Sequence, residues 1–229
     1  MDEVIKKFQK SSYYKFLIDR DDIILIYISG SRITGLEDEC SDYDIVILVA
    51  NGEYDDCSRY VHVRYKNTIG IHWYYHPLDV YFTTKNNTCT AVIQLRNLCD
   101  DVILYKNPKY DIIINKLYQY KDKLSNIQIY SFLNKYKNCV NNIITDGFLK
   151  EDYYSKYLYH LCLASYYILN DKPDKEFLKN LKHIYYNKIS KKYELLTIKR
   201  LKLYRDFIEQ NPIDVDKELN ILRKQILDK

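Results

Sequence analysis

The stretch that decides the fold runs from Ile23 to Val49. It reads IILIYIS over 23–29, Gly30-Ser31-Arg32-Ile33-Thr34-Gly35 at a turn, and, after a polar loop, Ser41-Asp42-Tyr43-Asp44 followed by IVILV. An apolar run that stops at a turn predicts a buried strand, and the second apolar run predicts another. The stretch therefore predicts a strand, a turn the size of a phosphate group, and a strand that carries acids.

The two acids have the spacing of a metal site. Asp42 and Asp44 are two positions apart, so in a strand both side chains leave the same face, with Cα atoms about 7 Å apart. Two such carboxylates can bind one divalent cation and leave room for a second, as two-metal phosphoryl transfer requires. Gly30 permits close backbone approach, the Ser31 hydroxyl can donate to phosphate oxygens, and Arg32 would add positive charge beside a triphosphate.

A third carboxylate on a neighbouring strand would complete this site. Asp79 is the strongest candidate, because the apolar residues of 78–82 predict a short strand around it. A buried aspartate without a partner is costly, and a metal ion would remove that cost. An ion pair would remove it as well, with Arg32, Arg59 or Arg64 as the partner.

Other polar residues leave alternatives open. If a different acid completes the site, the candidates are Asp55, Asp56 and Asp100, none of which lies in so apolar a run. Three histidines also cluster near the predicted sheet: His62, His72 and His76. The lysines and arginines of 182–205 either follow a nucleic-acid backbone or form the solvated face of a helix.

The rest of the chain divides into an α/β front half and an all-helical back half. Residues 2–20 have apolar positions at helical spacing, and two extended segments over 60–66 and 69–75 could pair as a hairpin. From Thr90 onward the apolar residues follow a 3.6-residue period. Further helices are predicted over 150–169, 174–186, 191–210 and 214–227.

The motif residues resemble the nucleotidyltransferase signature of the DNA polymerase β superfamily. The resemblance rests on Gly30-Ser31, on Asp42-Tyr43-Asp44 between apolar runs, and on Asp79. More narrowly, Gly30-Ser31-Arg32-x-x-Gly35-Leu36 with Ser41-Asp42-x-Asp44 resembles a bacterial and phage group of predicted nucleotidyltransferases. That group continues with a segment ending in Asn-Pro, here 95–108, and a helical tail with a Lys-x-x-x-His pair, here Lys156 and His160.

This resemblance implies an α+β fold. A mixed nucleotidyltransferase-type sheet with flanking helices would occupy residues 1–108, and an all-helical domain would occupy 109–229. It also implies that Asp42, Asp44 and Asp79 bind two Mg²⁺ or Mn²⁺ ions. The nucleotide would then be bound by Gly30, Ser31, Arg32, Lys156 and His160.

The implied activity is transfer of a nucleoside monophosphate from an NTP to an acceptor hydroxyl. Three acceptors fit the resemblance: a nucleic-acid 3′ end such as that of tRNA, a protein side chain, or a small molecule. The alternative is a catalytically silent module of the same fold that binds nucleotide or a protein. Three acids in one signature favour the enzyme over the silent module.

Composition limits the setting of this activity. The chain has 229 residues and a net charge of +4, which is compatible with a nucleic-acid partner without demanding one. Its longest apolar runs have seven or eight residues, whereas a bilayer crossing needs about 20. The N-terminus lacks the apolar core of a signal peptide, so we expect a cytoplasmic protein without a membrane partner. The six cysteines show no zinc-site or redox spacing.

Overall fold

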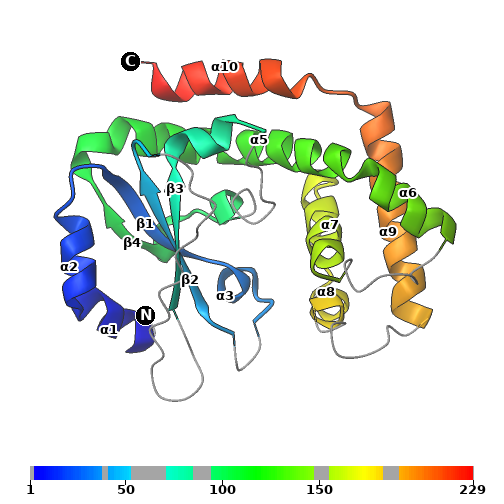
Figure 1. Ribbon diagram of the computed structural model, residues 1–229, viewed down its shortest axis with the longest axis horizontal. Coiled ribbons are helices and arrows are strands. Elements are labelled where there is room, and N and C mark those ends of the chain that lie inside the picture. Colours follow the sequence, from blue (N-terminus) through cyan, green and yellow to red (C-terminus); the bar gives the residue numbers. More distant parts are fainter. Residues whose placement is uncertain are drawn as a thin grey trace.

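The computed structural model describes residues 3–37, 41–52, 71–84, 94–146, 155–182 and 191–228. The fold is α+β, as the sequence predicts: a four-stranded mixed sheet carries helices on both faces, and further helices follow it (Figure 1). The strand order is β3-β2-β1-β4. The strands are β1 (Ile23–Ser29), β2 (Tyr43–Val49), β3 (Ile71–Pro77) and β4 (Ile103–Lys106).

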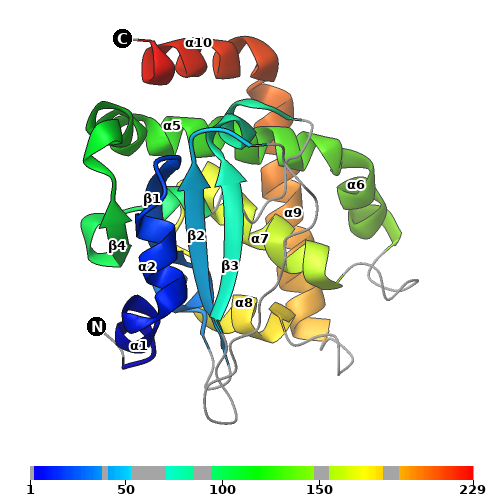
Figure 2. The same cartoon turned by 60° about the vertical axis from the view of Figure 1, so that its left-hand side comes forward.

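The pairing of the strands is mixed. β1 is antiparallel to both β2 and β4, whereas β2 and β3 are parallel and lie side by side (Figure 2). The predicted strands over 23–29 and 42–49 are therefore confirmed. The predicted hairpin partner of 69–75, the segment 60–66, lies outside the described residues. The strand observed in place of 69–75 is β3, and it pairs with β2.

Two short helices cover one face of the sheet. The sequence predicts one helix over 2–20, but the structure has α1 (Glu3–Lys10) and α2 (Ser12–Ile18). Ser11 separates them because its side chain accepts a hydrogen bond from the Tyr14 amide at 3.1 Å and so caps the second helix. Apolar side chains of both helices pack on alternate residues of β2 and β3 and on residues of β1 on the same side of the sheet.

Two long helices cover the opposite face. Tyr27, Val46 and Leu48 point into a cluster with the N-terminal half of α5 (Asp111–Lys135) and with α10 (Val215–Leu227). α5 runs from above the sheet into the helical half, and α10 returns along it to the sheet (Figure 1). The helical half thus contributes its first helix, α5, and its last helix, α10, to the core beside the sheet. The domain boundary at residue 108 stays a prediction.

The remaining helices form a second core. They are α6 (Lys137–Asp146), α7 (Ser155–Ile168), α8 (Lys175–Lys182) and α9 (Lys191–Gln210), together with the C-terminal half of α5. Leu36, which follows the short helix α3 (Ser31–Thr34), is 1% exposed and belongs to this core. The turn after β1 is therefore anchored in the helical half. Within the described part of the chain, no helix has both the length and the apolar character needed to cross a bilayer.

The edge strand β4 departs from the predicted helical pattern after Thr90. Residues 100–102 form a 3₁₀ turn, η2 (Asp100–Val102), and β4 then pairs with β1 at the edge of the described sheet. A second 3₁₀ turn, η3 (Pro108–Tyr110), leads into α5. Asn107 holds β4 in place: its amide donates to the Ile24 carbonyl at 3.0 Å, and its side chain donates to the Ile23 carbonyl at 2.9 Å. These bonds form only once the strands meet, so local periodicity does not reveal them.

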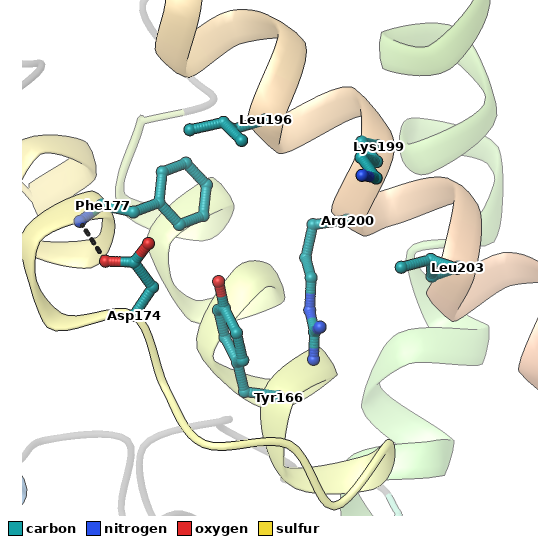
Figure 3. Close-up of a pocket in the computed structure, with 7 residues that line it drawn as sticks. All are labelled: Tyr166, Asp174, Phe177, Leu196, Lys199, Arg200 and Leu203. Carbon is teal, nitrogen blue, oxygen red and sulfur yellow. Dashed lines mark hydrogen bonds between the residues drawn. The ribbon is translucent and has the colours of Figure 1, made fainter.

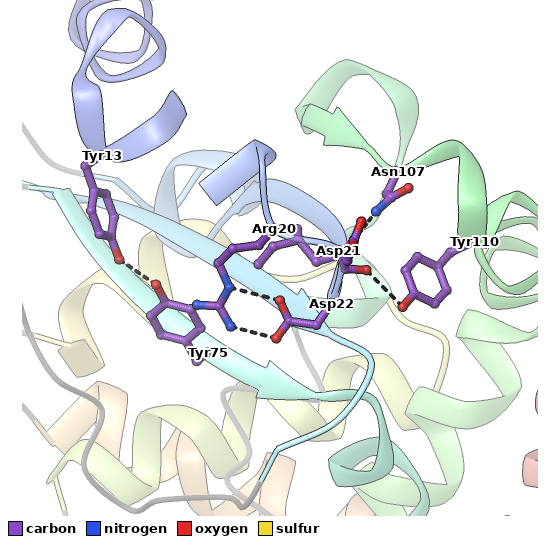
Figure 4. Close-up of polar contacts among 8 residues, drawn as sticks. Tyr13, Arg20, Asp21, Asp22, Tyr75, Asn107 and Tyr110 are labelled. Atoms are coloured by element: carbon purple, nitrogen blue, oxygen red, sulfur yellow. Dashed lines mark hydrogen bonds and ion pairs between the residues drawn. The ribbon is translucent and has the colours of Figure 1, made fainter. Parts of the chain in front are cut away.

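Polar contacts also fix the start of β1 between its neighbours (Figure 4). Arg20 donates to both oxygens of Asp22 at 2.9 and 2.6 Å, and this contact lowers the pKa of the Asp22 carboxyl. On the β3 side, the Tyr13 and Tyr75 hydroxyls are 2.6 Å apart. These contacts restrain the α2–β1 connection and join α2 to the neighbouring strand β3.

A buried histidine makes the stability of this sheet depend on pH. His76 on β3 is 6% exposed, its Nδ1 lies 3.0 Å from the Tyr81 hydroxyl, and burial lowers its pKa to about 4. An unfolded histidine has a pKa of about 6.5. Between these two values the unfolded chain binds more protons, so the free energy of unfolding falls as the pH drops from 6.5 towards 4.

We expect the variant His76→Asn to lose this pH dependence. Asparagine can keep a hydrogen bond to Tyr81 but does not titrate. Between pH 7 and pH 4.5 the free energy of unfolding of the parent protein should fall by roughly 2 to 3 kcal/mol more than that of the variant. Urea titrations at both pH values measure the difference, and parallel pH profiles would contradict the assignment.

Candidate functional site

The predicted turn and the predicted acids meet at one end of the sheet. The antiparallel register places Ser29, the last residue of β1, opposite Asp44 near the start of β2. Both residues are in phase with Tyr27 and Val46, which point towards α5. Asp42 lies two residues before Asp44, so both acids face the helical half beside the turn, as the sequence predicts.

Gly30 forms the wall against which Asp44 rests. Its φ of +79° lies in the left-handed region, and a Cβ there would be 2.7 Å from Asp44 Cγ and 2.9 Å from Asp44 Cβ. Only glycine fits this close approach. Ile33 and Thr34 donate to the Gly30 carbonyl at 3.2 Å each, which starts α3 directly after the turn.

We expect Gly30→Ala to destabilise the fold by about 2 kcal/mol, because it adds backbone strain and a collision with Asp44. Gly52→Ala is the matched control. A Cβ at Gly52 would be 3.5 Å from Pro77, an ordinary van der Waals distance. Urea unfolding measures both variants, and equal midpoints would contradict the predicted clash.

The structure does not bring Asp79 to the other two acids. Residues 78–82 form a 3₁₀ helix, η1 (Leu78–Phe82), and the Asp79 side chain is 68% exposed and 3.0 Å from Arg223 of α10. In the β2–β3 register, Asp44 lies opposite His72 and Val49 lies opposite Pro77. Asp79 follows Pro77, so it lies beyond the end of β3 that is far from Asp44. The intervening five residues correspond to about 16 Å of strand.

The predicted strand over 78–82 and the predicted third carboxylate at the site are therefore wrong. The 3₁₀ turn buries Leu78, Val80 and Tyr81 and leaves Asp79 in solvent, so the apolar pattern does not bury the acid. The alternative interpretation, an ion pair, is correct in kind, with Arg223 as the partner. Of the fallback acids, Asp100 pairs with Lys106 at 2.7 Å, and Asp55 and Asp56 lie outside the described residues.

Side chains of β3 occupy the position expected for the third acid. The Tyr74 hydroxyl donates to Asp44 Oδ1 at 3.0 Å, and His72 Nε2 lies 3.0 Å from Asp42 Oδ2. The alternation of polar residues over 71–77 is the sequence signal that β3 turns polar side chains towards the acids. Tyr74 itself does not stand out among the chain's 26 tyrosines. Across the described ranges, no three His, Cys, Asp or Glu side chains converge as a metal-binding group.

A buried hydroxyl completes the surroundings of Asp44. Ser29 is 1% exposed, and its Oγ has no hydrogen-bond partner within the described structure. A buried polar atom in this state lowers stability unless a bound group supplies a partner. The Ser29 hydroxyl therefore lies beside Asp44 at the end of β1 with its hydrogen-bonding capacity unused in the described structure.

Arg32 lies on the opposite face from the acids. Its Nε and Nη2 donate to the Ser41 carbonyl at 3.0 and 2.6 Å, and its guanidinium stacks 4.2 Å from the Tyr43 ring centroid. Tyr43 packs in the cluster under α1 and α2. The structure thus places Arg32 where it fixes the loop before β2, and its predicted role in nucleotide binding stays a prediction.

In the described part of the chain, the helical half contacts the turn through Lys175, a residue that the sequence analysis does not single out. Lys156 and His160 lie one turn apart on α7; the Lys156 side chain is outside the described structure, and the His160 ring lies 5.1 Å from that of Tyr159. Their role at the nucleotide stays a prediction. Lys175, the first residue of α8, reaches Gly35: its Cε is 3.2 Å from the point where a Gly35 Cβ would be.

A small pocket of about 180 Å³ lies within the helical half (Figure 3). Its lining combines apolar, aromatic and charged side chains: Tyr166, Asp174, Phe177, Leu196, Lys199, Arg200 and Leu203. Arg200 is 8% exposed and donates to Ser165 and Asp171. One arginine of the basic segment 182–205 is therefore buried and paired, whereas Lys199 and Lys202 are exposed on α9.

Comparisons with known proteins find distant similarity among solved structures. No family model matches the sequence, and no curated protein matches it. Among solved structures, the chain is similar to a nucleotidyltransferase-like protein from Exiguobacterium sibiricum 255-15. The two share 12% identity and a TM-score of 0.35 over 98% of this chain and 81% of the other. This similarity is too remote to assign residue roles, so the roles below depend on the contacts of the site itself.

Proposed function

We propose that this protein is a metal-dependent nucleotidyltransferase that moves a nucleoside monophosphate from an NTP to an acceptor hydroxyl and releases pyrophosphate. One observation carries the proposal. The Asp44 carboxylate lies against Gly30 at the turn that ends β1, and Asp42 stands two residues away on the same face. A pair of acids beside a glycine turn can hold a cation and a triphosphate together.

The donor set of the site fits Mg²⁺ or Mn²⁺. Both are hard cations that prefer oxygen ligands, and Mg²⁺ is usually bound by one or two carboxylates together with substrate phosphates. Asp42 and Asp44 supply those carboxylates, so a third protein ligand is not needed for one ion. Two bound ions would offset the charge that develops on the transferred phosphoryl group and on the leaving pyrophosphate.

The remaining residues of the turn position the substrate. Gly30 leaves room for the Asp44 carboxylate beside the turn, and the Ser31 hydroxyl can donate to a phosphate oxygen. Leu36 and the Lys175 contact hold the turn against the helical half, so the geometry of the site is set by both halves. The gain in rate would come from holding the acceptor oxygen and the α-phosphate in line.

For the acceptor we propose a nucleic-acid 3′ end, such as that of tRNA or another RNA, with a protein side chain or a small molecule as the alternatives. The exposed lysines of α9, Lys191, Lys192, Lys199 and Lys202, favour RNA because phosphate contacts dominate nucleic-acid affinity.

A catalytically silent nucleotide-binding module is the second candidate function. The position of Asp79 favours it, because the signature that the chain resembles has three acids and the structure gathers only two of them. Such a module would bind NTP and metal through the same turn without transferring the nucleotide.

Labelled NTPs test both candidates. Each of the four NTPs, with Mg²⁺ or Mn²⁺, is incubated with the protein alone, with total tRNA and with a cell lysate, and the labelled product is identified. Label on RNA or on protein supports the transferase and names the acceptor. If no label moves while calorimetry shows NTP binding, the silent module is correct, and if no NTP binds, both proposals fail.

A further inference from the structure

We propose that Tyr74 is a positioning residue that holds the Asp44 carboxylate ready to bind a cation. On this inference, β3 completes the site through a phenol hydroxyl where a third acid was expected. The inference rests on the proposed function, because it assigns Tyr74 a role only if Asp44 binds a metal ion.

The contact restrains both oxygens of Asp44. The Tyr74 hydroxyl donates to Oδ1 at 3.0 Å, while Oδ2 lies against the Gly30 backbone, where a Cβ would overlap it. The terminal torsion of an aspartate side chain has a broad energy minimum, so without such contacts the carboxylate can rotate. Tyr74 and Gly30 together select one orientation of the carboxylate plane.

The register of the strands shows that this contact belongs to a repeated arrangement. Asp44 is opposite His72 in the parallel pair, and Tyr74 is opposite Val46. Tyr74 nevertheless reaches Asp44, and His72 reaches Asp42, so both β3 side chains lean back by two residues, about 7 Å. Asp42, just before β2, and Asp44, within it, therefore each have a partner on β3.

The hydrogen bond is compatible with metal binding. A carboxylate oxygen has two lone pairs, so Oδ1 can accept the hydrogen bond from Tyr74 and still contact a cation. Residues that orient a metal ligand in this way typically contribute about 10- to 100-fold to metal affinity. The expected consequence of losing the hydroxyl is weaker metal binding with an intact fold.

The variant Tyr74→Phe removes only the hydroxyl, and Tyr75→Phe is a matched control. Tyr75 is the next residue of the same strand, points to the opposite face, and contacts the Tyr13 hydroxyl at 2.6 Å. The Mn²⁺ dissociation constant is measured on the full chain by electron paramagnetic resonance, with and without a non-hydrolysable NTP. We expect Tyr74→Phe to raise it about tenfold and Tyr75→Phe to leave it within twofold.

Two further measurements separate positioning from a structural role. Circular dichroism should show that both variants are folded, and saturating Mn²⁺ should restore transfer by Tyr74→Phe, which it would not do for a damaged fold. If Asp44→Asn abolishes Mn²⁺ binding but Tyr74→Phe binds as tightly as Tyr75→Phe, the inference is overturned and the proposed function stands. If the parent protein binds no Mn²⁺ under either condition, the metal-dependent function and the inference fail together.

Discussion

Replacing Asp44 by asparagine is expected to lower the rate of nucleotidyl transfer by about 1,000-fold or more. Asparagine keeps the shape of the side chain, and its oxygen can still accept the Tyr74 hydroxyl, but the negative charge that would bind a cation is lost. A loss of this size corresponds to about 4 kcal/mol of transition-state stabilisation. Initial rates at saturating NTP and metal measure the effect.

Asp79→Asn is the matched control for this variant. The Asp79 side chain is 68% exposed and pairs with Arg223 on the surface, and surface ion pairs typically contribute only about 0 to 1 kcal/mol. We therefore expect its transfer rate to stay within twofold of the parent protein. A loss in Asp79→Asn as large as that in Asp44→Asn would return Asp79 to the active site and contradict the structural assignment.

Replacing Arg200 by leucine is expected to lower the free energy of unfolding by about 3 kcal/mol. Arg200 donates to Ser165 Oγ at 2.9 Å, to the Ser165 carbonyl at 3.0 Å and to Asp171 at 2.5 Å, and it stacks 3.7 Å from the Tyr166 ring centroid. Leucine fills part of the volume but leaves the buried Ser165 carbonyl without this donor. The partly exposed Asp171 can be solvated again, which limits the loss.

Arg205→Leu provides the comparison on the same helix. Arg205 pairs only with its neighbour Asp206 among the described residues, and its side chain is 30% exposed. We expect a change within about 0.5 kcal/mol, as for most surface substitutions. Urea unfolding followed by circular dichroism measures both variants. Equal destabilisation would mean that the buried contacts of Arg200 add little to stability.

The part of the site formed by β1, the Gly30 turn and β2 could be predicted from residues close together in the sequence. The apolar runs of β1 and β2, the Gly30 turn and the spacing of Asp42 and Asp44 all lie within about one hairpin of sequence. β1 and β2 are consecutive antiparallel strands, and the alternation of their buried residues restricts the register in which they can meet. For the same reason, the helical periods of α9 and α10 were sufficient to locate those helices.

The part of the site formed by β3 could not be predicted in this way. Parallel strands are joined by a connection that leaves the sheet, so no local pattern states which residue of β3 lies beside Asp44. The polar partners of Arg200 and Asp79 likewise lie on helices distant in sequence, Ser165 of α7 for the first and Arg223 of α10 for the second.

By itself, the sequence determined the class of the fold, the turn and the two acids, because periodicity and turn chemistry act between residues that are close along the chain. The tertiary structure alone decided that Tyr74 and His72, and not Asp79, stand beside those acids. The physical reason is that the β2–β3 register and the packing of α10 depend on burial shared across the whole fold.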